Sequence, residues 1–317
     1  MYKEENLCNE NGKPKQLKWS FENIRSPFFY VGDKYKLINQ LKENFPADID
    51  RFIEPFCGGG SVFLNTNARS YALNDIDTNI VNLHNFLMSY SENKSVFWNE
   101  IKSTISRYQL SASFMGKAVP EDMRRQNVKT YFARYNKLAY TTMKNDFNAN
   151  RSPFLLYLLL IYGFNRFLRF NSKNEFNLPV GNVDFNFKVE KALNDYLDYV
   201  EGKEINFYNL DFVDFLKDIK LKSNDFVYLD PPYLISASEY NKVWNEENET
   251  RLINTLDWLN TNSIRFAVSN ILTHKKKHND IFHKWAQKYN IVKIKSNYIS
   301  FHDNSEKDTV EVLVKNY

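Results

Sequence analysis

The residues with the clearest chemical potential are Asp230-Pro231-Pro232-Tyr233, which follow the apolar residues 226–229. A proline has no backbone N–H and cannot continue a central strand, so this order predicts a buried strand that ends at Asp230. A carboxylate, two carbonyl groups and an aromatic ring are then left at the carboxyl end of a strand, where open α/β sheets bind ligands. The alternative is a plain surface turn, since Asp-Pro favours turns.

This combination of groups suits the exocyclic amino group of a nucleobase. The N6 amine of adenine is a poor nucleophile because its lone pair is delocalised into the ring. The Asp230 carboxylate and the Pro231 carbonyl can accept both of its N–H bonds and shift the nitrogen toward tetrahedral geometry, while Tyr233 offers its ring for stacking. The expected contribution is positioning and electrostatic stabilisation, with no deep proton abstraction.

A glycine-rich loop followed by a spaced acid points to a nucleoside-bearing cofactor. Residues 51–54 predict a short strand that enters the loop at residues 55–61, Pro-Phe-Cys-Gly-Gly-Gly-Ser. Consecutive glycines let a backbone approach a ligand without Cβ clashes. Asp75 follows the next predicted strand, at residues 71–73, where an acid is placed for ribose hydroxyls. The loop lacks G-x-G-x-x-G and the lysine of a P-loop, which disfavours a nicotinamide dinucleotide or a phosphate site.

The segment that begins near residue 26 fits the same cofactor site. A turn at Gly32 opens a helical pattern, and a helix N-terminus offers N–H groups and a positive dipole end to a carboxylate. Lys34 adds a charge and Tyr30 an aromatic wall. An ordinary capped helix is the alternative explanation.

The remaining pattern predicts an α/β fold. Asp211 and Phe212 follow one predicted strand, where they are placed to contact the edge of a cofactor ring and to stack on its face. Charged helical segments from residue 95 to residue 150 interrupt the alternation of strands and helices, which marks an inserted lobe. We expect helices at residues 78–88 and 244–260, and strands at residues 51–54, 71–73, 205–208, 226–229, 265–269, 290–299 and 309–314.

Residues 162–181 carry the strongest signature of nucleic-acid binding. Aromatic residues alternate with Arg and Asn up to residue 171, and residues 174–181 complete a predicted hairpin. Arginine can fork to O6 and N7 of guanine, asparagine pairs with adenine, and aromatic rings wedge between bases. The alternative is a hairpin at a sheet edge. Elsewhere in the lobe, helical spacing predicts a packed face formed by Tyr131, Tyr135, Leu138 and Tyr140.

Composition is that of a globular protein able to bind nucleic acid. The 317 residues are 43% hydrophobic, and the net charge of +4 permits nucleic acid as a partner. The apolar residues 152–161 are too few for a membrane span, and the polar, charged N-terminus is not a secretory signal. Cys8 and Cys57 give no disulfide framework and suit a reducing cytoplasm. The charge run at residues 274–278 predicts a solvated loop, because nothing nearby completes a metal site.

Taken in order, these motifs resemble the Dam-like (D12 class) DNA adenine-N6 methyltransferases from about residue 26 to the end. The series is Tyr30-Val-Gly-Asp-Lys34, then residues 54–61, Asn74-Asp-Ile-Asp77, the hairpin at residues 164–181 and Asp230-Pro-Pro-Tyr233. The resemblance implies S-adenosylmethionine as cofactor. It also implies a mixed, seven-stranded Rossmann-like sheet with an inserted, mainly helical DNA-recognition domain. The expected divisions are an N-terminal arm at 1–25, a catalytic domain at 26–94 and 187–317, and the recognition domain at 95–186.

The resemblance also assigns roles to individual residues of the cofactor and base sites. Tyr30 and Lys34 line the cofactor site, and Asp75 takes the ribose. The methionine end is held by the loop that includes Phe56, Gly58, Gly60 and Ser61. An adenine that has been flipped out of the duplex, as chemistry on a stacked base requires, is gripped by Asp230, Pro231, Pro232 and Tyr233.

In the hairpin, the resemblance makes Phe164 the intercalating aromatic residue and Arg169 the reader of guanine. Two departures leave the recognised sequence open. Asp33 stands where the family has a glycine, and Phe29 stands where Dam enzymes that read GATC carry a base-reading lysine. GATC and another short palindrome are both compatible with this pattern. The expected DNA contacts are Phe164, Asn165, Phe167, Arg169 and Pro179. Phe167 stands where the family has a smaller aliphatic residue.

Two other kinds of function are compatible with these motifs. Enzymes that methylate cytosine N4 use the same geometry, more often with Ser-Pro-Pro-Tyr, and RNA or protein-glutamine methylation tends to show Asn-Pro-Pro-Tyr. A DNA-binding protein that no longer catalyses is disfavoured because the glycines and Asp230 are retained. The expected setting is a cytoplasmic enzyme that acts as a monomer on duplex DNA, beside a restriction endonuclease that acts separately.

Overall fold

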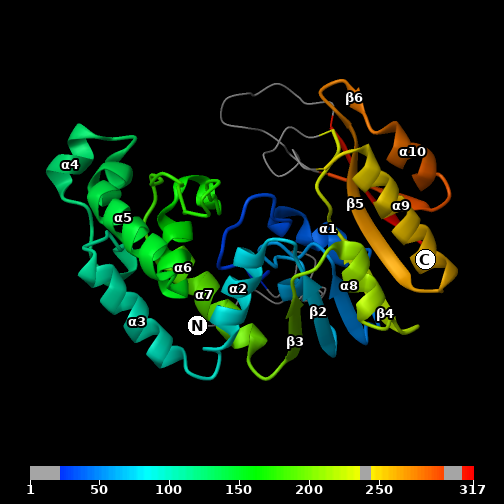
Figure 1. The fold of residues 1–317 in the computed structure, drawn as a ribbon, viewed down its shortest axis with the longest axis horizontal. Coiled ribbons are helices and arrows are strands. Elements are labelled where there is room, and N and C mark those ends of the chain that lie inside the picture. Colours follow the sequence, from blue (N-terminus) through cyan, green and yellow to red (C-terminus); the bar gives the residue numbers. More distant parts are fainter. Residues whose placement is uncertain (1–21, 236–243, 296–308) are drawn as a thin grey trace, which may run out of the picture.

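The centre of the molecule is a mixed β-sheet with the strand order β3-β2-β1-β4-β5-β8-β7 (Figure 1). The computed structural model describes residues 22–235, 244–295 and 309–317, so most of the expected N-terminal arm lies outside it. The strands are β1 (Arg51–Glu54), β2 (Ser70–Asn74), β3 (Glu204–Tyr208), β4 (Asp225–Leu229), β5 (Arg265–His274), β6 (Lys277–His278), β7 (Asn290–Ile294) and β8 (Val310–Lys315). Strands β1 to β5 are parallel, β8 is antiparallel to β5 and β7, and β6 folds back on β5.

The predicted strands are all present, and the predicted mixed, Rossmann-like sheet is confirmed. Every residue of β4 is buried, which is expected for a strand whose two faces are both covered by helices. Strand β5 continues past the predicted end at residue 269 to His274. The predicted strand at 290–299 ends as β7 at Ile294, and its last four residues lie outside the described part of the chain.

The strand order reverses its direction between β1 and β4. From β1 the chain proceeds outward through β2 and β3, and then returns to place β4 on the other side of β1. Parallel pairing aligns Ile53 with Val227, so the two strands end at the same edge of the sheet. Ligands of open α/β sheets bind at such a reversal of strand order. The fold therefore directs both the glycine-rich loop and Asp230 to one place.

Alternating side chains of the central strands bury the two faces of the sheet in different cores. Phe52 and Tyr228 belong to the core shared with α1 (Ile38–Lys42), α2 (Thr78–Met88) and α7 (Phe187–Val200). Ile53 and Val227 belong to the core shared with α8 (Phe212–Asp218), α9 (Glu246–Thr261) and α10 (Asp280–Ala286). The predicted helix at residues 78–88 matches α2 residue for residue, with the Asp77 side chain accepting a hydrogen bond from the Asn79 backbone N–H at 2.9 Å.

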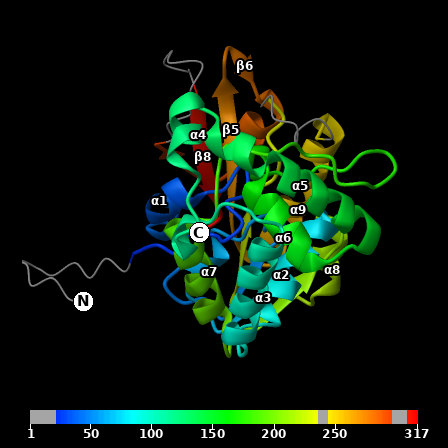
Figure 2. The ribbon, with the colours of Figure 1, turned by 90° about the vertical axis from the view of Figure 1, so that its left-hand side faces the viewer.

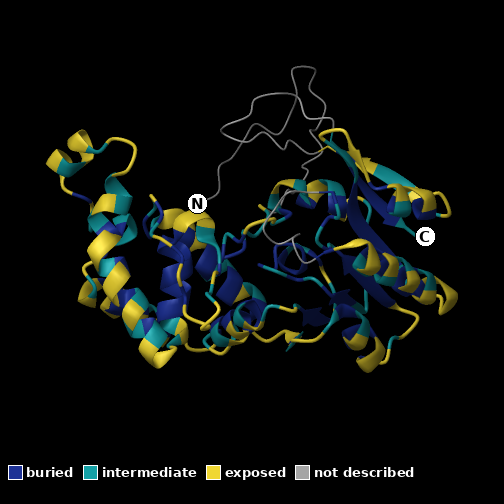
Figure 3. Ribbon diagram, turned by 45° about the horizontal axis from the view of Figure 1, so that its top comes forward, coloured by how far each residue is buried: buried dark blue, intermediate teal, exposed yellow. Residues whose placement is uncertain are grey.

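A helical lobe lies beside the sheet (Figures 1 and 2). It comprises α3 (Lys94–Arg107), α4 (Glu121–Gln126), α5 (Tyr131–Asn150) and α6 (Pro153–Tyr162). Helix α6 is the apolar stretch noted in the sequence, and all its residues from Leu155 to Tyr162 are buried (Figure 3). It packs against both α5 and α2, so it joins the lobe to the helices that cover the sheet. In the described part of the chain no helix is both long and apolar enough to cross a bilayer.

The predicted packed face of the lobe is wrong at one position. Leu138 is 80% exposed, whereas Tyr140 is buried. The buried row of α5 is offset from the predicted one and includes the polar Asn136, which donates to the Ser111 hydroxyl at 2.9 Å and to the Val183 carbonyl. A polar side chain on the packed face hides such a row from a search for apolar spacing.

Residues 164–181 form a hairpin-like loop without regular strands. The segment starts in a 3-10 turn, η4 (Phe164–Arg166). Isolated bridges then pair Gly163 with Val180 and Phe170 with Phe176. The predicted return of the chain is therefore confirmed, and we call this segment the recognition loop. Its role in DNA binding stays a prediction at this point.

Candidate active site

Asp230 and Lys34 form an ion pair at the carboxyl end of β4. Lys34 Nζ lies 2.7 Å from Asp230 Oδ2, and the two side chains are only 7% and 17% exposed. The Tyr233 hydroxyl donates to the other oxygen, Asp230 Oδ1, at 2.8 Å. Burial on its own lowers the pKa of Lys34, but the Asp230 and Glu311 carboxylates more than offset it and hold that pKa above its ordinary value. The structure thus unites the predicted cofactor lysine with the predicted catalytic carboxylate.

Local structure explains how these two residues meet. Strand β4 ends at Leu229, and the prolines at 231 and 232 turn the chain away from the sheet. Lys34 precedes the 3-10 turn η1 (Tyr35–Leu37), and its carbonyl accepts from the Leu37 N–H at 2.8 Å. This turn leads directly into α1, so the helical pattern expected after Gly32 is present and begins as a 3-10 turn. The ring of Tyr233 is 9% exposed, and its centroid lies 5.1 Å from Lys34 Nζ. Its proposed role in base stacking stays a prediction.

Asp33 has a clear structural role at the position where a glycine was expected. Its Oδ2 forms an ion pair with Arg25 Nη2 at 2.9 Å, and its Oδ1 accepts from the Tyr35 backbone N–H at 3.1 Å. The carboxylate therefore fixes the turn that carries Lys34, directly beside the Lys34–Asp230 pair.

Two buried acids that the sequence did not single out surround the ion pair. Glu311 of β8 is 1% exposed, and its Oε1 lies 3.4 Å from the Tyr233 hydroxyl. Glu54 ends β1 and is 2% exposed, and its Oε2 has no hydrogen-bond partner among the described residues. Burial, reinforced by the charges of Asp230 and Asp75, raises the pKa of Glu54 well above its ordinary value. An acid inside an apolar strand was the available signal for both residues.

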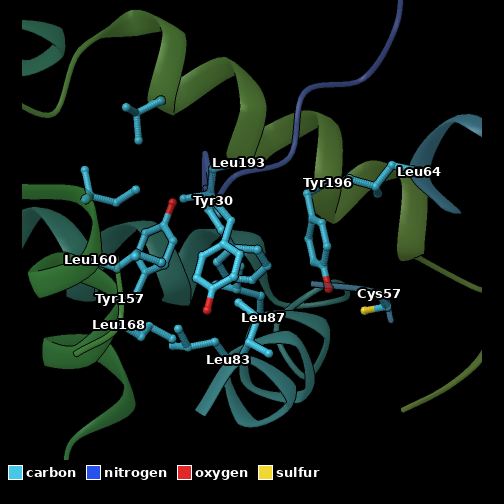
Figure 4. Close-up of a cluster of buried hydrophobic side chains, with 14 of the residues drawn as sticks. Tyr30, Cys57, Leu64, Leu83, Leu87, Tyr157, Leu160, Leu168, Leu193 and Tyr196 are labelled. Carbon is cyan, nitrogen blue, oxygen red and sulfur yellow. The ribbon is translucent and has the colours of Figure 1, made fainter. Parts of the chain in front are cut away.

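The glycine-rich loop packs tightly against the segment that carries Lys34. A Cβ on Gly59 would lie 2.8 Å from the Cβ of Tyr30, and one on Gly60 would lie 2.2 Å from the ring of Phe63. Gly60 also has a φ of +79°, which favours glycine. Tyr30 itself is buried, among Tyr157 and Leu87 (Figure 4). Close backbone approach therefore requires glycine at both positions.

The buried His84 forms a hydrogen bond with the glycine-rich loop. Burial lowers the pKa of His84 to about 4, so the ring is neutral at physiological pH. Its Nε2 lies 2.9 Å from the carbonyl oxygen of Gly58. A carbonyl oxygen can only accept a hydrogen bond, so Nε2 carries the hydrogen. Nδ1 is then the acceptor for the Tyr196 hydroxyl, at 3.1 Å. Burial raises the pKa of the neighbouring Cys57 thiol well above its usual range. Cys57 is thus a packed thiol, as a small buried residue is expected to be.

Asp75 closes the glycine-rich loop onto the end of β2. Its Oδ2 accepts from the Gly58 backbone N–H at 2.8 Å, and its Oδ1 accepts from the Asp77 backbone N–H at 2.9 Å. Burial raises the pKa of Asp75 to about 6. The Tyr30 hydroxyl donates to the adjacent Asp77 carboxylate at 3.4 Å. The predicted contact of Asp75 with a ribose is not tested by this arrangement and stays a prediction.

The residues around the loop fit the cofactor that the resemblance implies. Two buried oxygens, Glu54 Oε2 and Ser61 Oγ, have no hydrogen-bond partner among the described residues. Both atoms lie on or next to the glycine-rich loop, where the strand order reverses between β1 and β4. S-adenosylmethionine carries an ammonium group, a carboxylate and a ribose, so it has both donors and acceptors for such atoms. Tyr30, Lys34, Asp75 and the loop from Phe56 to Ser61 would hold it.

Asp211 and Phe212 lie at the start of α8 and are engaged with neighbouring side chains. Asp211 accepts from the Val213 backbone N–H at 3.0 Å and forms an ion pair with Arg251 at 2.6 Å. Phe212 is 5% exposed, and its ring centroid lies 5.1 Å from that of Phe56. Little of the Phe212 side chain is therefore accessible to a ligand. The proposed contact of these two residues with a cofactor ring stays a prediction.

The recognition loop presents all but one of the predicted DNA-binding residues at the surface. Phe164 is 53% exposed, and its N–H donates to the Pro179 carbonyl at 2.9 Å. Asn165 is exposed and has a left-handed backbone with φ of 54°. Arg169 is exposed, but its Nε and Nη2 donate to the side chain and carbonyl of Asn177 at 2.8 and 2.9 Å. Phe167 is half-buried against the main core. The loop thus keeps the large apolar side chain of Phe164 more than half exposed.

The sequence model of the family described as D12 class N6 adenine-specific DNA methyltransferase matches residues 30–299. The match spans the glycine-rich loop, the recognition loop and Asp230. The chain therefore belongs to the D12 class of N6 adenine-specific DNA methyltransferases.

Individual relatives are of two lengths. The chain is 33% identical to the type II methyltransferase M.FokI of Planomicrobium okeanokoites, over 93% of this chain and 43% of that protein. It is also 33% identical to the modification methylase StsI of Streptococcus sanguinis, over 93% and 43% of the two chains. The DNA adenine methylase of Haemophilus influenzae is 30% identical over 75% of this chain and 74% of that protein. This chain thus spans under half the length of the first two relatives.

Proposed function

We propose that this chain transfers a methyl group from S-adenosylmethionine to N6 of an adenine in a short duplex DNA site, as the modification enzyme of a restriction–modification system. The observation that carries the proposal is the Lys34–Asp230 ion pair at the carboxyl end of β4, where the strand order reverses. Membership of the family and the names of the relatives support the choice of adenine and of DNA.

Asp230 and Pro231 position the nucleophile. Each carboxylate oxygen accepts more than one hydrogen bond, so Asp230 can hold Lys34 and Tyr233 and still accept from the N6 amine. The Pro231 carbonyl accepts the second N–H, and the nitrogen lone pair is freed from the ring. When bound, S-adenosylmethionine supplies an electrophilic methyl group. Asp230 holds the amine while the N6–methyl bond forms and the sulfonium C–S bond breaks to leave a neutral thioether, and the extra N6 proton then passes to water. This positioning and electrostatic work needs no covalent enzyme intermediate.

A stacked adenine cannot reach the buried end of β4, so the base must leave the duplex. Phe164 is the residue proposed to fill the space that it vacates, because it is an aromatic side chain that stays 53% exposed. Asn165, Phe167, Arg169 and Pro179 are proposed to contact the bases beside it. The DNA sequence that they read, GATC or another short palindrome, is part of the same proposal.

The direct test is to incubate the purified protein with unmethylated duplex DNA and methyl-labelled S-adenosylmethionine, and to digest the product to nucleosides. Label in N6-methyladenine supports the proposal. Label in N4-methylcytosine would retain the fold and the cofactor but overturn the substrate. DNA binding without label would identify a DNA-binding protein that does not catalyse.

A further inference from the structure

The guanidinium of Arg166 in the recognition loop stacks on the ring of Phe29. Its Cζ lies 4.1 Å from the ring centroid. Arg25 approaches the same ring at 5.3 Å and also lies 4.5 Å from the ring of Tyr35. Two arginines therefore flank one phenylalanine. A stacked guanidinium has a fixed plane, which is the requirement for recognising a flat, forked acceptor.

The two guanidinium groups differ in how their charges are compensated. Arg25 is paired with Asp33 at 2.9 Å. Arg166 has no ion pair, and its side chain donates no hydrogen bond, within the described part of the chain. Its Nε is fully buried without a partner, whereas Nη1 and Nη2 reach solvent. Arg166 thus presents two donors on one edge and carries a positive charge that no carboxylate pairs with.

The backbone around this stack is strained. Asn165, Arg166 and Phe29 have φ values of 54°, 50° and 49°, in the left-handed region that residues with a Cβ rarely adopt. Such strained positions cluster at functional sites. The unusual backbone conformation at Asn165 and Arg166 directs the Arg166 side chain toward Phe29. The stack is therefore kept although this backbone conformation is unfavourable.

The stack also sets where Arg166 lies relative to the active site. Phe29 directly precedes Tyr30, which packs on the glycine-rich loop, and the same segment continues to Lys34 and its partner Asp230. Arg166 follows Phe164, the exposed aromatic residue of the loop, by two positions. Its free edge therefore lies between the recognition loop and the segment that carries the ion pair.

We propose that Arg166 reads a guanine next to the target adenine, through bonds from Nη1 and Nη2 to O6 and N7. This inference rests on the proposed action on duplex DNA. Guanine presents two acceptors in the major groove, and a forked arginine is its commonest partner. Arg169 differs because two of its donors are already engaged by Asn177. Arg166 and Arg169 therefore specify different base positions.

The test compares the wild-type protein with Arg166→Ala, Arg166→Lys and Arg169→Ala. Each is equilibrated with a duplex library randomised around a fixed adenine, and bound and methylated molecules are sequenced separately. Wild type should favour guanine at a position beside the adenine. Arg166→Ala and Arg166→Lys should both lose that preference by about 5- to 150-fold at this position only, because lysine keeps the charge but lacks the fork. Arg169→Ala should keep it.

Other results would overturn the inference. If Arg166→Lys kept the preference, and Arg166→Ala weakened binding equally for all sequences, the side chain would contact a phosphate instead. If both variants only lowered the melting temperature, Arg166 would be a packing residue. Phe29→Leu provides a second check, since loss of the ring should weaken the same preference while binding of S-adenosylhomocysteine persists. Base preference without methyl transfer in the wild type would refute the proposed function and leave this inference standing.

Discussion

Lys34 Nζ lies 2.7 Å from Asp230 Oδ2, although the two residues are 196 positions apart in the sequence. The contact joins the first motif of the family to the last one. Lys34 sits on the turn fixed by Asp33, and Asp230 sits at the end of a fully buried strand, so neither partner has room to move far. A rigid acceptor is what the proposed chemistry requires, because its catalytic effect comes from positioning.

Removing the ammonium of Lys34 is expected to destabilise the fold as well as the site. Lys34→Met leaves the Asp230 carboxylate without its charged partner in a largely buried position, and breaking such a pair costs about 3–5 kcal/mol. Lys34→Arg keeps the charge and should lose less. Urea denaturation of both variants measures the difference. Equal free energies of unfolding for wild type and Lys34→Met would show that the pair does not stabilise this site.

Gly59→Ala is expected to damage the cofactor site by steric overlap alone. The added Cβ would lie 2.8 Å from Tyr30 Cβ, so the loop or Tyr30 must shift. We expect affinity for S-adenosylhomocysteine to fall at least about tenfold, or about 1.4 kcal/mol, in a calorimetric titration. Gly202→Ala is the matched control, since its φ is +68° and no atom lies within 4 Å of the added Cβ. The control should lose about 1–2 kcal/mol of stability and bind normally; equal binding by both variants would argue against the loop as the cofactor cradle.

Protonation of His84 should weaken the fold in mild acid. Its pKa is about 4 when folded, against an ordinary value of 6.5, because burial disfavours the charged ring. The folded state therefore binds fewer protons, so this contribution is complete above pH 6.5 and is lost as pH falls through 4. The expected loss between these values is about 3 kcal/mol. Asp75 has the opposite effect on stability. Burial raises its pKa to about 6, so its protonation favours the folded state as pH falls toward 4.

A variant separates these two contributions. His84→Gln keeps a donor for the Gly58 carbonyl and removes the titration, so its free energy of unfolding should lose less between pH 6.5 and 4 than that of wild type. Chemical denaturation at several pH values provides the comparison. Parallel pH curves for the two proteins would contradict a neutral, buried His84.

Arg169→Ala is expected to relax base choice at one position of the recognised site, at a cost of about 1–3 kcal/mol. The measurement is the rate of methylation of duplexes that differ by one base pair. Unchanged discrimination would show that Arg169, with two donors held by Asn177, only shapes the loop, and that the recognition loop was assigned wrongly.

The sequence predicted the sheet and the motifs that end its strands because apolar strands and the residues that stop them are local signals. Asp230 and Asp75 were placed at strand ends in this way, and the structure agrees. Glu54 and Glu311 were missed because an acid in an apolar run gains meaning only when distant strands bring it near Asp230. The stack of Arg166 on Phe29 could not be predicted from the sequence either. It depends on backbone turns with positive φ, which the residue types at these positions do not indicate.

The most direct test of the account compares wild type with Asp230→Ala in a single-turnover methylation assay and in a DNA-binding assay. Asp230 is proposed to hold the N6 amine, while the recognition loop is proposed to hold the duplex. We expect methyl transfer to be abolished in Asp230→Ala and DNA affinity to be largely unchanged. A normal rate of methyl transfer in this variant would contradict it, because the amine would then be activated somewhere else.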